Sequence, residues 1–322
     1  METFELKPGS LVIDLKEHDP EFAQVILQEM NEERFNRKHI DAKIKKEIQG
    51  SQAMMGKVEQ GIAMVHKYIN TTYSYASKNK RIEQIKGLDI TELVMDIFIG
   101  VAYNIRPALF TSVSAQMAAR LRFSDKTEAI ATVAELLAVL CNTDAFDILK
   151  ANKMASLELV SRIPLSENLK DFIDNSQYLP PMVVTPLELT HNYSSGYLTH
   201  NDSLILGQGN HHDGDLCLDV LNTINSVALK VDTEFLSKVE EEPTFDLDTQ
   251  DKVDQWKRFK KTGYMFYDLM VQHGNRFYLT HKVDKRGRIY ACGYHINSQG
   301  APFKKAMLEF ANEELVEGVP LD

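Results

Sequence analysis

The sequence contains little cysteine, no long apolar run and no recognisable leader. Its three cysteines, Cys141, Cys217 and Cys292, are widely spaced and form no C-x-x-C pair, which argues against a disulfide framework or a zinc ribbon and for a reducing compartment. The most apolar stretch, 93–103, is about half a membrane span and contains Asp96. The first five residues lack the basic and apolar regions of a signal peptide. We therefore expect a soluble, cytoplasmic protein with no membrane partner.

Positive charge is also in deficit, with 36 Lys and Arg against 46 Asp and Glu and a net charge of −10. This balance at first argues against a nucleic-acid partner. Residues 251–305, however, contain twelve basic and four acidic residues, so this segment carries +8 and the remainder −18. A basic segment on an acidic body is typical of a groove that follows phosphates, because neutralised phosphates release counterions. A solvated basic helix explains the same pattern.

The length of 322 residues and the 43% apolar content predict a well-buried core and about two domains. Helical spacing of apolar residues and capping residues predict a mainly α fold with short β segments. The expected helices cover 19–50, 89–103, 124–149 (capped by Ser124 or Asp125), 216–235 and 256–273. Prolines around a β-branched run predict a short edge strand or connector at 178–186, followed by a surface loop to 214 and a strand at 277–280.

The predicted helix 256–273 is both apolar and basic. Trp256, Phe259, Gly263, Phe266 and Met270 are expected along one side. The early basic residues are Lys257, Arg258, Lys260 and Lys261. Four cations within five residues cannot all face one way, so we expect this helix to contact phosphates over only part of its circumference.

Residues 284–290 read D-K-R-G-R-I-Y and carry the pattern D-x-x-G-R-x-Y. Gly287 permits a turn closed to residues with a side chain, or a close backbone approach to a nucleic-acid strand. Arg288 offers a planar fork suited to phosphate oxygens, and Asp284 is placed to orient that guanidinium. An internal salt bridge between Asp284 and Arg288 at a strand end is the structural alternative.

This segment resembles the D-x-x-G-R region of the single-subunit phage and mitochondrial RNA polymerases. The resemblance continues through N-S-Q-G at 297–300 and a lysine before an apolar segment that is expected to be helical. Weaker similarity lies at 181–186, 196–197 and 220–225. The resemblance covers about half of the chain, and residues 1–170 are not matched.

The resemblance implies specific nucleic-acid contacts. Asp284, Arg286, Gly287 and Arg288 would contact the RNA–DNA hybrid and the DNA template. Tyr290 would lie against the template or hybrid, and Lys305 would approach the RNA strand. Lys285 departs from the family's usual residue and is assigned no contact. The implied division is a helical N-terminal domain over 1–240, a short thumb over 241–281 and a palm-edge segment over 282–322.

In the family, the two aspartates that hold two Mg²⁺ ions and the residues that position the nucleoside triphosphate follow D-x-x-G-R. Only 32 residues follow Tyr290 here, which is too few for a palm and fingers. The resemblance therefore implies the smaller, N-terminal subunit of a heterodimeric phage-type RNA polymerase, with no catalytic or metal-binding residue of its own. Its partner chain would hold the Mg²⁺. The resemblance also implies an accessory DNA-binding protein that helps to open promoters. It places the polymerase in the cytoplasm of an infected bacterium.

Two other functions stay open. The chain is alternatively a non-catalytic nucleic-acid-binding protein derived from a truncated polymerase, or a helical interaction protein whose basic segment docks on an acidic protein surface. An exposed apolar face, expected on Phe303, Met307, Leu308 and Phe310, favours the polymerase subunit.

Overall fold

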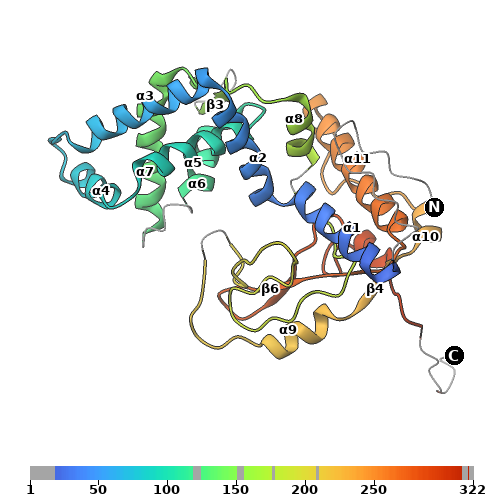
Figure 1. Cartoon of the computed structure of the whole chain (residues 1–322). Helices are drawn as coiled ribbons and strands as arrows, with labels where there is room; N and C mark the ends of the chain where they lie inside the picture. Colours follow the sequence, from blue (N-terminus) through green and yellow to red (C-terminus); the bar gives the residue numbers. More distant parts are fainter. Residues whose placement is uncertain are drawn as a thin grey trace. The chain divides into compact units, whose positions relative to one another are not determined.

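The computed structural model describes residues 19–118, 125–150, 156–175, 178–207, 210–313 and 318. In these ranges the protein is mainly α-helical, with short strands in small sheets (Figure 1). This confirms the predicted fold class. Across the same ranges, the structure has no helix with the length and apolar character needed to span a membrane.

The chain packs as two units. The first contains the described residues of Met1–Phe35, Tyr178–Leu206 and Asn210–Asp322, and the second contains those of Asn36–Gln177 with Gly207. We call them the motif unit and the helical unit. The boundaries of these two units follow the packing of the chain, and they differ from the boundaries predicted at residues 240 and 281. The division into N-terminal domain, thumb and palm edge concerns function and stays a prediction.

The helical unit surrounds one apolar helix. Its helices are α2 (Arg37–Gly50), α3 (Gln52–Ile69), α4 (Ala76–Lys86), α5 (Ile90–Tyr103), α6 (Phe110–Ala118), α7 (Lys126–Leu140) and α8 (Glu167–Asn175). An antiparallel sheet has the order β1 (Ala108–Leu109), β3 (Leu157–Ser161), β2 (Phe146–Lys150). Asp89 caps α5 by accepting hydrogen bonds from Thr91 N and Glu92 N.

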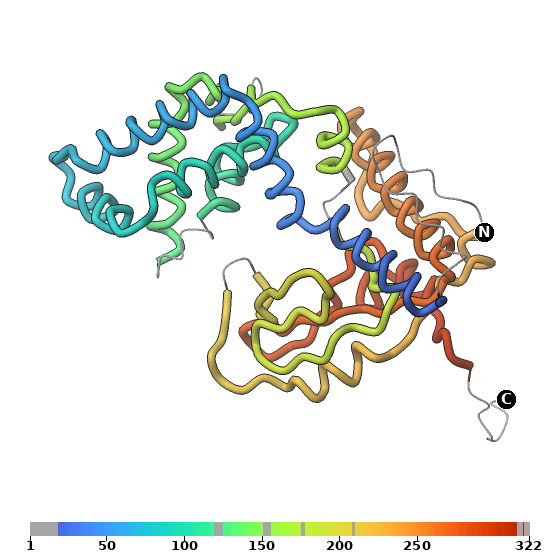
Figure 2. The backbone as a smooth tube through the Cα atoms, in the orientation of Figure 1, coloured from blue at the N-terminus to red at the C-terminus, as the bar shows by residue number. Residues whose placement is uncertain are grey.

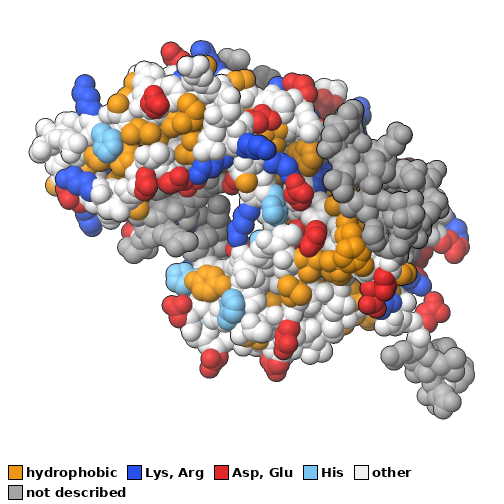
Figure 3. All heavy atoms as spheres, in the orientation of Figure 1, with side chains coloured by type: hydrophobic (Ala, Val, Ile, Leu, Met, Phe, Trp, Pro, Cys, Tyr) orange, Lys and Arg blue, Asp and Glu red, His pale blue; other side chains and the backbone are white. Residues whose placement is uncertain are grey.

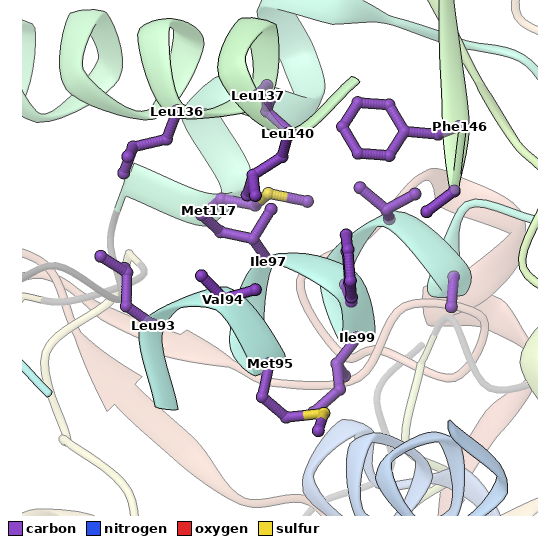
Figure 4. Packing of buried hydrophobic residues seen from close by; sticks show 14 of the residues in the cluster. Leu93, Val94, Met95, Ile97, Ile99, Met117, Leu136, Leu137, Leu140 and Phe146 are labelled. Atoms are coloured by element: carbon purple, nitrogen blue, oxygen red, sulfur yellow. The ribbon is translucent and has the colours of Figure 1, made fainter. Parts of the chain in front are cut away.

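Helix α5 is buried on most of its surface, which explains the most apolar stretch of the sequence. Figure 4 shows Val94 and Ile97 of α5 near Met117 of α6 and Leu140 of α7. Val94, Leu136 and Leu140 are fully buried. The apolar run therefore forms the core of the helical unit, as expected of a helix that is apolar all round.

The predicted helix 124–149 is correct only in its first part. Helix α7 begins after Asp125, whose carboxylate accepts from Thr127 N and Glu128 N, and it ends at Leu140. Ser124 lies outside the described residues. A 3₁₀ turn over Cys141–Thr143 follows, and Asp144 adopts φ +54°, which reverses the chain into β2. The chain thus leaves α7 through a 3₁₀ turn that ends at a left-handed residue, which apolar spacing does not predict.

The motif unit combines helices with two small sheets. Its helices are α1 (Pro20–Phe35), α9 (Leu218–Asn225), α10 (Thr233–Lys238), α11 (Gln250–Gln272) and α12 (Pro302–Ala306). One antiparallel sheet has the order β5 (Phe277–Tyr278), β4 (Ala228–Val231), β8 (Leu308–Phe310), and a hairpin joins β6 (His281–Val283) to β7 (Ile289–Ala291).

Helices α1 and α11 lie side by side (Figure 1), with the rings of Phe35 and Phe266 5.2 Å apart. Helix α11 begins earlier than predicted, at Gln250, because Thr249 accepts a hydrogen bond from Lys252 N. Gly263, Phe266 and Met270 are buried, as the predicted apolar side requires.

The predicted helix 216–235 is wrong. The segment is divided into α9, β4 and α10, with Leu216 and Val227 outside these elements, and β4 is the central strand between β5 and β8. The side chain of Asn275 pairs with Val231, accepting from its N–H and donating to its carbonyl, both at 2.9 Å. Hydrogen bonds from distant segments thus override the helical spacing here.

The apolar helix expected after the paired lysines is also wrong. Helix α12 ends at Ala306, and the chain continues into strand β8. Met307 is fully buried, whereas Phe310 is 69% exposed. These residues therefore do not share the single exposed apolar face that was predicted.

Residues 178–207 and 210–214 contain no helix, as predicted, but they are not merely a surface loop. Figure 2 shows this part of the tube winding beside the hairpin. Met182 pairs with Tyr278, and Ile205 forms a parallel bridge with Val283. Leu189, Leu204 and Ile205 are buried, so the segment contributes core residues to the motif unit.

A buried carboxylate on α1 holds this segment. Glu32 is completely buried and accepts hydrogen bonds from Gln28 Nε2, Leu198 N, Thr199 N and Thr199 Oγ1 at 2.6–2.9 Å. His200 Nδ1 lies 3.7 Å from its Oε2. Burial by itself raises the pKa of Glu32, but these partners outweigh it and lower the pKa from 4.5 to about 2. The carboxylate is therefore ionised and fully partnered.

We expect Glu32→Ala to lower the free energy of unfolding by about 3–5 kcal/mol, because the donors of a buried charge lose their acceptor. Since the folded pKa is depressed, the stabilisation from Glu32 is complete above pH 4.5 and is lost as the pH falls towards 2. Urea unfolding followed by circular dichroism at pH 7 and pH 3 measures both effects. Glu29→Ala, at an exposed position of the same helix, is the control and should change little.

Candidate functional site

The D-x-x-G-R residues form the turn of the β6–β7 hairpin. The strands pair Val283 with Ile289 and His281 with Ala291. Asp284 N donates to Arg288 O, and Gly287 N donates to Asp284 O, each at 2.9 Å. Gly287 has φ +82°, and a Cβ added there would meet nothing within 4 Å. The backbone conformation therefore favours glycine, and the space beside it is open.

One carboxylate organises this turn. Oδ1 of Asp284 accepts from Arg286 N at 2.9 Å and from Arg288 N at 3.0 Å. Its Oδ2 accepts from both guanidinium groups, at 2.8 Å and 3.0 Å from Arg286 and at 3.1 Å from Arg288 Nε. Burial of the carboxyl opposes its ionisation, but the hydrogen bonds and charge of Arg288 outweigh burial, so the pKa of Asp284 is lowered.

The arginines stay accessible although they are paired. The Asp284 side chain is only 14% exposed, whereas those of Arg286 and Arg288 are 70% and 54% exposed. Arg288 uses Nε for Asp284, and its terminal nitrogens make no hydrogen bond within the described ranges. The guanidinium of Arg288 also lies 5.7 Å from the ring centre of Tyr290. The internal salt bridge is thus present, and it leaves the outer edge of the guanidinium free for an anion.

The hairpin is supported from its β6 side. Leu206 N donates to Val283 O and Val283 N donates to Leu204 O, both at 2.8 Å. Lys282 pairs with Asp202 at 2.6 Å. His281 Nδ1 lies 2.9 Å from Asn225 Oδ1, and burial lowers the pKa of this histidine. The turn is therefore carried by a strand that is bonded on both edges.

The basic residues of α11 differ in their surroundings. Lys257, Arg258 and Lys261 are exposed, and no acidic partner is found for them among the described residues. Lys260 instead pairs with Glu240 at 2.9 Å, with its ammonium 6.0 Å from the ring of Tyr264. On the face shown in Figure 3, basic and acidic side chains are interspersed. Three of the four predicted cations are therefore available to a ligand on this helix.

The two adjacent lysines, Lys304 and Lys305, also differ. Lys305 is exposed, as a contact residue must be. Lys304 is 9% exposed, donates to Tyr294 O at 2.6 Å, and lies 4.7 Å from the ring of Tyr294 and 5.3 Å from that of Phe259. Burial lowers its pKa, although nearby Glu241 acts in the opposite direction. The sequence does not predict which of two adjacent lysines is buried.

The described residues contain no group of three or more His, Cys, Asp or Glu side chains placed to hold a metal ion. What the geometry offers is recognition of anions by oriented guanidinium groups.

Comparison with known proteins adds one relative. The chain is 27% identical over 188 residues to a protein of Gelasinospora sp. (strain G114) named "Probable DNA-directed RNA polymerase". The similarity covers 54% of this chain and 20% of the relative, so the chain spans about a fifth of that protein. No protein-family model matches the chain. The similarity supports a link to RNA polymerase and does not address a division into subunits.

We expect Gly287→Ala to destabilise the motif unit by roughly 1–2 kcal/mol, because a side chain disfavours the left-handed conformation at φ +82°. The surrounding space is open, so no clash adds to this cost. Gly50→Ala, which also has open space but no positive φ, is the matched control and should be neutral or slightly stabilising. Thermal unfolding of both variants would measure the difference, and equal effects would contradict the assignment.

Proposed function

We propose that this chain is a subunit of a DNA-dependent RNA polymerase of the single-subunit, phage-type family. In this proposal it supplies the N-terminal domain, a short thumb and the D-x-x-G-R hairpin. A partner polypeptide supplies the palm and fingers, holds the Mg²⁺ ions and binds the nucleoside triphosphates. An accessory DNA-binding protein assists promoter opening, and the assembly works in the cytoplasm of an infected bacterium.

The observation that carries the proposal is the pair of outward guanidinium groups held by one carboxylate. Asp284 orients both Arg286 and Arg288 through its two oxygens. Nucleic-acid backbones are recognised by planar cations of this kind, and fixing them beforehand reduces the entropy lost on binding. The similarity to a probable DNA-directed RNA polymerase supports a hybrid or template strand as the ligand.

Other predicted residues extend this surface in the proposal. Tyr290 lies next to Arg288 and offers a ring to a base or sugar. Lys305 and the α11 cations Lys257, Arg258 and Lys261 are exposed and add attraction for phosphates. Lys260 contributes less, because Glu240 neutralises it. The chemistry of phosphoryl transfer remains with the partner, since it needs the paired metal ions.

Co-expression with a candidate palm-bearing polypeptide tests the proposal. We expect a stable complex that incorporates nucleotides in the presence of Mg²⁺, whereas the purified chain by itself makes no RNA. The control is the partner polypeptide alone, which should be inactive or strongly impaired. If the chain binds nucleic acid but no co-expressed polypeptide restores synthesis, the non-catalytic nucleic-acid-binding protein is the better description.

Arg288→Ala should weaken binding of an RNA–DNA hybrid by about 5- to 100-fold, because one oriented phosphate contact is worth roughly 1–3 kcal/mol. Assembly with the partner should be unchanged, since Arg288 is 54% exposed. Arg106→Ala provides a matched control, because Arg106 is 59% exposed and also pairs with one aspartate, Asp174. Fluorescence anisotropy measures the affinity. A loss of assembly equal to the loss of binding would identify Arg288 as structural.

A further inference from the structure

Strand β7 has a second edge that β6 does not use. Gln299 occupies this edge: its Oε1 accepts from Ala291 N at 2.9 Å, and its Nε2 donates to Ile289 O at 3.1 Å. Residues two apart in a strand present their backbone groups to the same edge. The backbone groups of Tyr290 therefore face β6, where this residue is paired with Lys282. One side chain thus replaces a missing strand.

The loop that carries Gln299 is built to hold it there. Gln299 N donates to Asn297 Oδ1 at 2.7 Å, and Asn297 Nδ2 donates to Ala291 O at 3.3 Å. The loop folds so closely on itself that a Cβ on Gly293 would lie 1.9 Å from Ile296 O. Only glycine permits this approach, so Asn297 and Gly293 of the same loop specify the placement of Gln299.

The two residues bonded by Gln299 are the neighbours of Tyr290. Because side chains alternate along a strand, Arg288 and Tyr290 lie on one face and Ile289 and Ala291 on the other. The contact of Arg288 with the Tyr290 ring agrees with this arrangement, and Tyr290 OH also lies 3.4 Å from Asp284 Oδ2. Movement of the β7 backbone would therefore move Tyr290 and Arg288 together.

We propose that Gln299 is a positioning residue, which holds β7 so that Arg288 and Tyr290 face the bound nucleic acid without touching that ligand itself. The inference rests on the proposed function, because it assigns Gln299 to the same hybrid-binding hairpin. It predicts that removal of Gln299 and removal of Arg288 affect a shared interaction, so that their free-energy effects are less than additive.

A double-mutant cycle on the full chain tests this. Gln299→Met keeps the side-chain length and removes both hydrogen bonds. We expect it to lower affinity for an RNA–DNA hybrid about 5-fold, which corresponds to an interaction energy typical of residues in contact. Where Arg288→Ala lowers affinity by a similar factor, the double variant should lose clearly less than the product of the two single losses, because part of the effect of Gln299 acts through Arg288. In parallel, hydrogen exchange at the Ala291 amide should become faster. Gln255→Met, at an exposed position of α11, should change neither readout.

The outcomes separate the two proposals. If the single effects multiply to about 25-fold, Gln299 acts independently of Arg288 and the inference is wrong. If the wild-type chain binds no hybrid, the proposed function falls and the inference falls with it. Should Gln299→Met fail to fold, Gln299→Glu takes its place, because it keeps the acceptor for Ala291 N–H and loses the donor for Ile289 O. Unchanged hybrid affinity in a folded Gln299 variant would likewise overturn the inference.

Discussion

The motif unit depends on one buried carboxylate, that of Glu32. A charge inside the protein is tolerated only when it is fully hydrogen-bonded, and here Leu198 and Thr199 supply three of the four donors. This requirement joins α1 to a segment more than 160 residues away in sequence. That segment continues into residues 204–206, which bond the outer edge of β6. The D-x-x-G-R turn is therefore supported through a path that begins at α1.

The turn itself shows how a paired charge can stay available. Asp284 is sheltered and the two arginines are exposed, so the carboxylate fixes orientation while the outer guanidinium edges remain in solvent. An exposed ion pair of this kind contributes little to stability. Its value lies in geometry, because the arginines are ordered before a ligand arrives. The salt bridge and the binding surface are thus two aspects of one arrangement.

Short strands and non-helical segments in this unit are completed by side-chain amides. Asn222 bonds both the N–H and the carbonyl of Leu189, Asn275 does so for Val231, and Gln299 bridges Ala291 and Ile289. Strands of two to four residues leave many backbone groups unpaired, and buried groups of this kind are costly. An amide carries a donor and an acceptor, so it can satisfy both with one side chain. Small sheets can then satisfy their backbone groups without further strands.

The sequence by itself determined the features that depend on neighbouring residues. Asp89 and Asp125 mark the starts of α5 and α7, the apolar side of α11 follows from its spacing, and Gly287 marks the turn.

The tertiary structure decided the rest. The spacing of residues 216–235 is compatible with a helix, but β5, β8 and Asn275 draw its centre into a sheet. Likewise, burial of Lys304 and pairing of Lys260 depend on Tyr294 and Glu240, which lie elsewhere in the chain. Local capping and steric preferences are written in adjacent residues, whereas strand pairing and the accessibility of a charge are set by partners that only folding brings together.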